Sequence, residues 1–168
     1  MYSKVCLNGE SLEVKEYRPH VFAMLRTHAG IDEVDYSSSL TSDNLCAITS
    51  DSKSGQSFWT SSNGRVVLKT IKDYEARNMI GILDSYALHV TMAPSAIAAV
   101  LGLYRVTNRA GKKTYFLACA NVYPSVAISR KFDLKGSLVG RKASPSSSVA
   151  KDLDLISSGA SLKFSSSR

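Results

Sequence analysis

Apolar residues recur at helical spacing in the first third of the chain. Four of them follow a proline at position 19: Val21, Phe22, Leu25 and Ala29. The spacing predicts a helix over residues 17–30. Residues 31–40 predict a second short helix, with Asp32 as its cap. Residues 44–49 fit a weak strand, and the pattern leaves residues 1–16 unassigned.

A strand hairpin is the clearest local prediction. Residues 56–61 and 65–71 are strand-like runs, and Ser62-Asn63-Gly64 joins them. An Asn-Gly pair between such runs is a strong hairpin signal. Asp73 is then predicted to cap a helix that ends before Pro94. One side of this helix is apolar: Ala76, Met79, Ile80 and Leu83.

Two more strands are predicted over residues 100–107 and 113–119, joined by Asn108-Arg109-Ala110-Gly111. A further strand-like run covers residues 132–137, and an apolar stretch covers residues 153–156. The order of hairpin, helix and hairpin predicts an antiparallel sheet with packed helices. The expected fold class is therefore α+β.

Bulk composition fits an ordinary folded domain. The 168 residues are 44% hydrophobic and 21% charged. No run approaches the roughly 18 apolar residues of a membrane span, and the first ten residues lack a signal-peptide core. We therefore expect an intracellular protein whose three cysteines are reduced and carry no metal.

Charge is distributed unevenly along the chain. Residues 1–50 hold four basic and seven acidic side chains, whereas residues 101–168 hold twelve basic and three acidic ones. The basic last third predicts an anionic partner, such as lipid head groups, nucleotide phosphates or nucleic acid. A solvated lysine-rich face is the alternative. Nucleic acid is disfavoured because aromatic and basic residues are not interleaved.

Three segments carry candidate chemistry. Lys53-Ser54-Gly55-Gln56-Ser57 has the small residues and the lysine of a phosphate-binding loop, although a plain surface turn uses the same residue types. Lys69 lies in an apolar strand, where it must reach solvent or an anion. An outward-facing lysine on an edge strand is the alternative. Phe132-Asp133-Leu134-Lys135-Gly136-Ser137 precedes Gly140-Arg141, and it would fix charges beside a phosphate.

Taken in order, these segments resemble the phosphatidylinositol phosphate kinase family. The matching stretches cover nearly the whole chain: Arg18-Pro19, Gly30-Ile31-Asp32, the run from Val67 to Ile71, Glu75, Gly102-Leu103-Tyr104-Arg105-Val106, Asn121-Val122-Tyr123-Pro124, the Asp133-to-Ser137 block and Lys151-Asp152-Leu153-Asp154-Leu155. The block Asp-Leu-Lys-Gly-Ser makes the resemblance specific, because protein kinases lack it.

The resemblance implies an ATP-dependent lipid kinase that phosphorylates the inositol ring, with phosphatidylinositol 4-phosphate 5-kinase activity as the expected form. Residues 1–168 would form part of a SAICAR synthase-like kinase domain. Its divisions would be amino-terminal helices (1–43), a nucleotide-binding sheet and helix (44–124), and the signature segment with the start of the second lobe (125–168).

The resemblance also implies roles for individual residues. Those expected at the nucleotide are Lys53, Ser54, Gly55, Ser57, Lys69, Glu75, Asn121 and Val122. Among these, Lys69 would hold the phosphates, Glu75 would orient Lys69, and Asn121 and Val122 would lie at the adenine. Lys69, Asp133 and Lys135 are the expected catalytic residues, and Lys135 and Arg141 would bind the lipid substrate.

Several features depart from the family pattern. Ser52 replaces a usual glycine, and the stretch from Asn121 to Phe132 is one residue short. The sequence ends at Arg168 without the family's catalytic and magnesium-binding aspartates. We therefore expect Mg²⁺ to lack its ligands here, and the chain to be inactive alone. A non-catalytic basic adaptor that binds membranes is the alternative.

The expected partners are ATP and a phosphoinositide at an anionic membrane, with no nucleic acid, and a homodimer. The expected location is cytoplasmic and peripheral to the plasma membrane. The bases expected to face the membrane are Arg130, Lys131, Lys135, Arg141 and Lys142.

Overall fold

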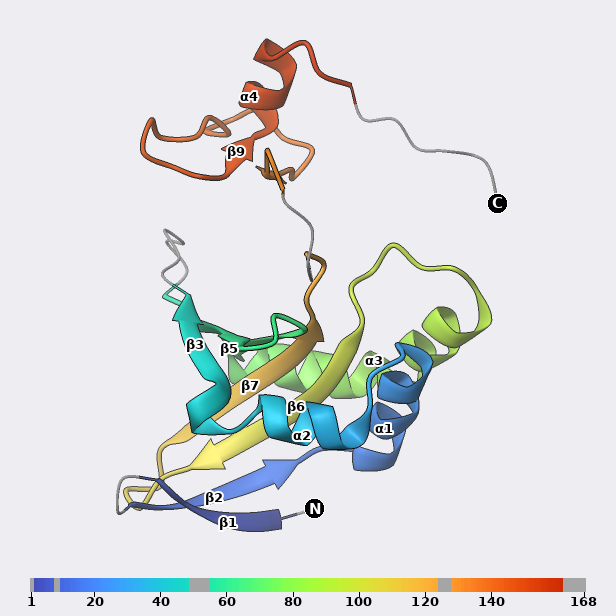
Figure 1. Cartoon of the computed structure of the whole chain (residues 1–168), viewed down its shortest axis with the longest axis vertical. Coiled ribbons are helices and arrows are strands. Elements are labelled where there is room, and N and C mark those ends of the chain that lie inside the picture. Colours follow the sequence, from blue (N-terminus) through green and yellow to red (C-terminus); the bar gives the residue numbers. More distant parts are fainter. Residues whose placement is uncertain (1, 8–9, 49–54, 124–127, 162–168) are drawn as a thin grey trace. The chain divides into compact units, whose positions relative to one another are not determined.

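A computed structural model describes residues 2–7, 10–48, 55–123 and 128–161. The chain divides into two compact units, Met1–Ser125 and Val126–Arg168. The N-terminal unit combines a large antiparallel sheet with helices (Figure 1), which confirms the predicted α+β fold class.

The sheet of the N-terminal unit has seven strands in the order β1-β2-β6-β7-β5-β4-β3, and all neighbouring pairs are antiparallel. Their bounds are β1 Tyr2–Leu7, β2 Glu10–Glu16, β3 Leu45–Ile48, β4 Phe58–Ser61, β5 Val66–Ile71, β6 Val100–Thr107 and β7 Lys113–Ala120. The second predicted hairpin, β6–β7, lies at the centre of this sheet.

The β4–β5 hairpin is confirmed, and its turn is held by side-chain contacts. Gly64 has φ 69°, a conformation that glycine adopts without strain. The Oδ1 atom of Asn63 accepts hydrogen bonds from the Ser61 hydroxyl at 2.6 Å and from the Arg65 amide at 3.1 Å. The Asn-Gly pair therefore fixes the register in which Phe58 lies opposite Lys69.

Strands β1 and β2 were left unassigned by the sequence pattern. They pair with each other from Tyr2↔Lys15 to Leu7↔Glu10, and β2 extends the sheet by pairing with β6. β2 is rich in charged residues (Glu10, Glu13, Lys15 and Glu16), whereas β1 has only Lys4 and lies at the sheet edge. Asn8-Gly9, which separates the two strands in sequence, was the available hairpin signal.

Three helices pack on the sheet: α1 Pro19–His28, α2 Glu33–Ser39 and α3 Asp73–Met92. The Asp32 carboxylate accepts the amides of Val34 and Asp35, as predicted. A single 3₁₀ turn, Ser42–Asn44, follows α2.

The predicted cap of α3 is wrong by one position. The residue before the helix is Lys72, and its amide donates to Glu75 Oε2 at 2.7 Å. Asp73 is the first helical residue and forms an ion pair with Arg77 one turn later. A glutamate at the third helical position thus satisfies the amide at the start of the helix.

The helices cover both faces of the sheet, with α2 in front and α3 behind in Figure 1. One buried cluster joins α1 and α3 to the sheet: Phe22, Leu25, Ile71, Ala76, Leu83, Ala87, Val100 and Leu103. The other cluster contains α2: Ile31, Tyr36, Val66, Leu101 and Ala118. Alternate residues of a strand face opposite sides, so Lys69 shares the α3 face with Ile71 and its cross-strand partner Leu117.

A buried arginine connects α1, α2 and β6. Arg26 is 4% exposed, and it forms two hydrogen bonds to the Glu33 carboxylate at 2.7 and 2.9 Å. Its Nη1 donates to the Leu101 carbonyl at 2.7 Å, and its guanidinium lies 4.5 Å from the centre of the Tyr36 ring. The charge is therefore paired and hydrogen-bonded, as burial requires.

Gly102 lies against two tyrosines, the buried Tyr36 and the half-buried Tyr104. The hydroxyls of Tyr36 and Tyr104 are 2.9 Å apart, and burial raises the pKa of Tyr104 to about 12 and that of Tyr36 further. A Cβ atom at position 102 would lie 2.5 Å from the Tyr36 hydroxyl. Only glycine leaves room for this hydrogen-bonded pair.

The C-terminal unit is held by one aspartate. Strands β8 (Phe132–Asp133) and β9 (Ala150–Lys151) pair in parallel, and helix α4 spans Asp152–Ser157. Asp152 Oδ1 accepts the amides of Lys135 at 3.0 Å and Gly136 at 2.9 Å, and its Oδ2 accepts Arg141 Nε at 2.8 Å. The predicted strand 132–137 ends early because these amides bind Asp152 and not another strand.

We expect Gly102→Ala to destabilise the N-terminal unit by about 1–3 kcal/mol, because the added methyl group overpacks the tyrosine pair. Gly81→Ala is the matched control, because no atom lies within 4 Å of the Cβ position on α3. It should stabilise by about 0.5–1 kcal/mol through helix propensity. Urea unfolding of both variants measures the difference; equal effects would contradict the packing argument.

The hydrogen bonds that the Asp152 carboxylate accepts should be lost in acid. The Arg141 hydrogen bond, with the two amides, lowers the pKa of Asp152 from 3.8 to about 2. A carboxylate whose pKa is lowered by folding stabilises the fold above its ordinary pKa, and this contribution is lost as the pH falls from about 4 through about 2.

The protection of the Lys135 and Gly136 amides against hydrogen exchange, taken relative to the intrinsic exchange rate at each pH, should therefore fall over that pH window. Asp152→Asn should show fast exchange at neutral pH and no transition in acid. Asp84→Asn, at an exposed ion pair with Arg18, is the control and should leave both amides unchanged. Acid-independent protection in the wild-type chain would refute this role of Asp152.

Candidate functional site

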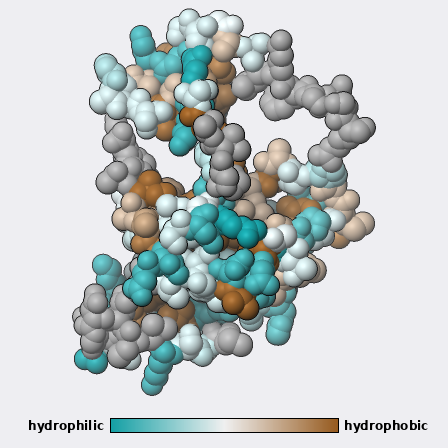
Figure 2. Space-filling model, viewed as in Figure 1, coloured by the Kyte–Doolittle hydropathy of each residue, from teal (hydrophilic) through white to brown (hydrophobic). Residues whose placement is uncertain are grey.

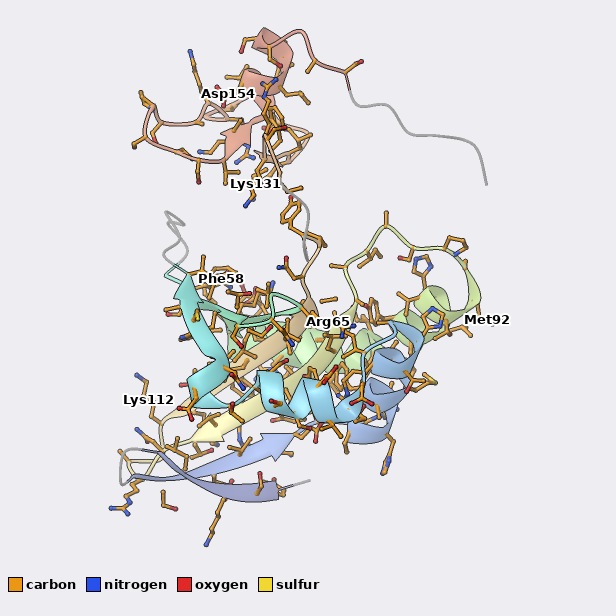
Figure 3. The ribbon with its side chains drawn as sticks, viewed as in Figure 1. Phe58, Arg65, Met92, Lys112, Lys131 and Asp154 are labelled. Atoms are coloured by element: carbon orange, nitrogen blue, oxygen red, sulfur yellow. The ribbon has the colours of Figure 1, made fainter. Side chains whose placement is uncertain are left out.

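Lys69 lies at the centre of the candidate nucleotide site. It is half-buried on β5, between Phe58 of β4 (Figure 3) and Leu117 of β7. Burial raises the pKa of the nearby Cys119 thiol, and the positive charge of Lys69 opposes this rise. None of the ion pairs within 4 Å among the described residues includes Lys69. Its ammonium group is thus a charge without a carboxylate partner in the described part of the chain.

Part of the candidate phosphate loop can be placed. Lys53 and Ser54 lie outside the described residues, whereas Gly55 is exposed with φ 65°. The Ser57 amide donates to Thr70 Oγ1 at 2.9 Å, and the Thr70 amide donates to the Ser57 carbonyl at 3.0 Å. Ser57 is therefore fixed beside the residue that follows Lys69. Its backbone amide is already used, so only its side chain is available to a phosphate.

Glu75 has a different partner from the one the resemblance implies. Its carboxylate accepts the Lys72 amide at the start of α3, and no ion pair within 4 Å joins it to Lys69 among the described residues. The ion pair by which Glu75 was expected to orient Lys69 is therefore not present among the described residues. Glu75 instead stabilises the first turn of the helix that packs behind Lys69.

Asn121 lies where β7 ends, and its contacts are structural. Its amide donates to the Arg65 carbonyl at 2.8 Å, and its Nδ2 donates to the Gly64 carbonyl at 2.7 Å. Its Oδ1 accepts the Tyr123 amide at 3.0 Å. Asn121 thus joins the end of β7 to the β4–β5 turn. Val122 follows it with 62% of its surface exposed.

In the C-terminal unit, the contacts of Asp133, Lys135 and Arg141 can be compared with the roles that the resemblance implies for them. Arg141 has a side chain only 12% exposed, paired with Asp152 at 2.8 Å and with Asp133 at 3.2 Å. It also donates to the Asp133 carbonyl. These contacts satisfy its guanidinium internally, which argues against an open substrate-binding arginine. Lys135 is 61% exposed and lies 3.5 Å from Asp133.

Sequence reasoning missed the two residues that hold these groups in place. Asp152 lies 11 residues after Arg141, and Thr70 lies 13 residues after Ser57. No local pattern connects either pair. The available signal for Asp152 was an acid in the first turn of an apolar helix, where a negative charge is favourable.

No group of three or more His, Cys, Asp or Glu side chains that could hold a metal occurs among the described residues. The described residues therefore offer no such cluster for Mg²⁺. No helix within the described ranges has the length and apolar character needed to cross a bilayer.

Comparisons with known proteins agree with these features. The model of the Phosphatidylinositol-4-phosphate 5-Kinase family matches residues 39–168. A phosphatidylinositol 4-phosphate 5-kinase 9 of Arabidopsis thaliana is 35% identical over 155 residues, covering 88% of this chain and 19% of the relative. A phosphatidylinositol 5-phosphate 4-kinase type-2 alpha of Sus scrofa is 37% identical over 153 residues, covering 86% and 37%. The type-2 beta protein of Rattus norvegicus is 33% identical over 179 residues, covering 96% and 43%.

The chain thus spans about a fifth to two fifths of the length of these relatives. The family match covers more than half of the chain and includes β3 to β7, α3 and the whole described part of the C-terminal unit. This match agrees with the sheet, the strand lysine and the Asp-Leu-Lys-Gly-Ser block. It shows that the chain belongs to the phosphatidylinositol-4-phosphate 5-kinase family.

Proposed function

We propose that this chain is the nucleotide-binding part of a kinase that transfers a phosphoryl group from ATP to the inositol ring of a phosphoinositide. The proposed acceptor is phosphatidylinositol 4-phosphate, in line with the description of the family. Relatives of similar identity include phosphatidylinositol 5-phosphate 4-kinases, so both lipids belong in any assay.

The position of Lys69 is the observation that best supports this proposal. A half-buried ammonium group without a carboxylate partner among the described residues favours an anionic ligand. Ser57 and Gly55 precede the neighbouring strand, and the small side chains there leave space for phosphate oxygens. Phosphoryl transfer depends largely on positioning and charge neutralisation, and Lys69 would supply the charge.

The adenine is proposed to lie against residues 121–123. Asn121 holds the end of β7 in place, so the backbone of Val122 is presented at a fixed position. Backbone groups of such a segment can donate to and accept from a purine edge. No step of this proposal depends on a metal ligand from the described residues.

The lipid side of the proposal involves the exposed bases of the C-terminal unit. Arg141 is assigned a positioning role, because Asp152 and Asp133 already pair with it. Arg130, Lys135 and Lys142 are exposed and are proposed to face the anionic head groups. The dimer and the plasma-membrane location remain predictions.

A non-catalytic membrane adaptor is the second candidate. The basic last third of the chain would serve either protein, so charge does not separate the two. ATP binding does separate them, because an adaptor has no use for a nucleotide-holding lysine.

We expect Lys69→Met to weaken ATP binding about ten- to a hundredfold, because charge-assisted contacts to phosphate contribute about 1.5–3 kcal/mol. Lys112→Met is the matched control. Lys112 (Figure 3) is exposed in the β6–β7 turn, and its hydrogen bonds to Asn108 are made by its backbone amide and carbonyl. Titration calorimetry with ATP measures both variants. Equal affinity of the wild-type and Lys69→Met chains would reject the site, and absence of ATP binding would favour the adaptor.

Binding to anionic vesicles should depend on the bases of the C-terminal unit. The triple change Arg130→Glu, Lys131→Glu and Lys135→Glu should abolish sedimentation with phosphatidylinositol 4-phosphate vesicles, and wild-type binding should weaken as salt rises.

The matched control for this charge reversal is Arg109→Glu, Lys112→Glu and Lys113→Glu, which makes the same change of charge at the exposed β6–β7 turn. This control should retain most of the binding. If both triple variants lose binding equally, net charge and not the C-terminal unit determines the interaction.

A further inference from the structure

Two neighbouring apolar side chains are exposed at a turn of the C-terminal unit. Val139 is 90% exposed, the largest fraction of any large hydrophobic residue in the described ranges, and Leu138 is 55% exposed. Single exposed apolar residues are common on protein surfaces. A consecutive pair at a turn is unusual enough to need a physical reason.

The turn itself is tightly held. The Arg141 amide donates to the Leu138 carbonyl at 3.2 Å, and Gly140 has φ 67° at the third position, as a type II turn requires. The Asp152 carboxylate accepts the Gly136 amide before the turn and Arg141 Nε after it. One buried side chain thus closes the loop at both ends. The apolar pair is presented by an ordered loop, so little conformational entropy remains to be lost on binding.

The surroundings of the turn are basic. The described part of the unit has six basic and three acidic side chains. Its acids are engaged internally: Asp152 with Arg141 and two amides, Asp154 (Figure 3) with the amides of Ala143 and Lys151, and Asp133 with Arg141 and Lys135. Lys135 and Lys142, which flank the turn, are exposed. Hydrophobic and hydrophilic side chains accordingly lie together on the surface of this unit (Figure 2).

We propose that the Leu138-Val139 turn inserts into the interfacial layer of an anionic membrane while Lys135 and Lys142 contact the head groups. This inference rests on the proposed function and adds a second, apolar source of membrane affinity to the electrostatic one. Stable peripheral binding generally needs two such signals, because charge alone weakens with salt and one short apolar element alone binds weakly. The membrane is favoured over a protein partner because two exposed bases, Lys135 and Lys142, flank the apolar pair.

The test compares vesicle sedimentation of the chain with that of a double variant, Leu138→Ser and Val139→Ser. The matched control is Val34→Ser with Met92→Ser, which removes apolar side chains that are 76% and 77% exposed in the N-terminal unit. Vesicles contain phosphatidylcholine with or without phosphatidylserine, at low and high salt. The turn variant should lose about tenfold in partitioning and lose the binding that survives high salt. The control should bind as the wild type does.

A reporter measures insertion directly. Val139→Trp in a Trp59→Phe background should show a blue-shifted emission with anionic vesicles and quenching by brominated lipids, whereas Val34→Trp in the same background should show neither. Unshifted emission of the Val139→Trp chain, or unchanged binding of the turn variant, would overturn the inference. The second result is also what a turn that packs on protein would give.

ATP calorimetry separates this inference from the proposed function. If the turn variant binds vesicles like the wild type while Lys69-dependent ATP binding is intact, the insertion is wrong and the kinase proposal stands. If the wild-type chain binds neither ATP nor anionic vesicles, the kinase proposal fails and the insertion fails with it.

Discussion

The N-terminal unit depends on the burial of one charged group, the guanidinium of Arg26. This side chain contacts α2 through Glu33 and β6 through the Leu101 carbonyl. Removing one partner of a buried ion pair typically costs about 3–5 kcal/mol, because the remaining charge loses its compensation. These contacts of Arg26 therefore favour one arrangement of α1 and α2 on the sheet. That sheet in turn fixes Lys69 between Phe58 and Leu117.

Much of this fold could be predicted from short-range patterns. The Asn63-Gly64 hairpin, the helix after Lys72 and the two strands around residues 108–111 each carry their signal within about ten residues. Strands β1 and β2 could not be assigned in the same way, because the six-residue edge strand β1 and the charge-rich β2 both have a weak apolar period. Arg26 gave no signal either, since a lone arginine in an amphipathic helix ordinarily lies at the surface.

The candidate site was predictable to a different degree in each unit. Lys69 stood out because its neighbours in the strand are apolar. Glu75 and Arg141 were singled out for nucleotide and lipid roles, but the partners they have in the structure are not those that the resemblance implies. Arg141 pairs with Asp152, which lies 11 residues away and is brought close only by folding, whereas Glu75 accepts the amide of Lys72 at the start of its own helix. A planar guanidinium that satisfies a carboxylate and a carbonyl together is suited to a structural role, whereas a flexible, exposed lysine remains available to a ligand.

The ring contact between Trp59 and Phe116 determines what optical spectroscopy can observe. Trp59 is the chain's sole tryptophan, and its ring centre lies 5.9 Å from that of Phe116, across β4 and β7. Its native emission therefore monitors the sheet of the N-terminal unit directly, whereas the chain has no tryptophan among the residues around Asp152. A single sharp fluorescence transition would thus be compatible with two units that unfold independently. Two-state behaviour can be concluded only when a probe in residues 128–161 gives the same midpoint.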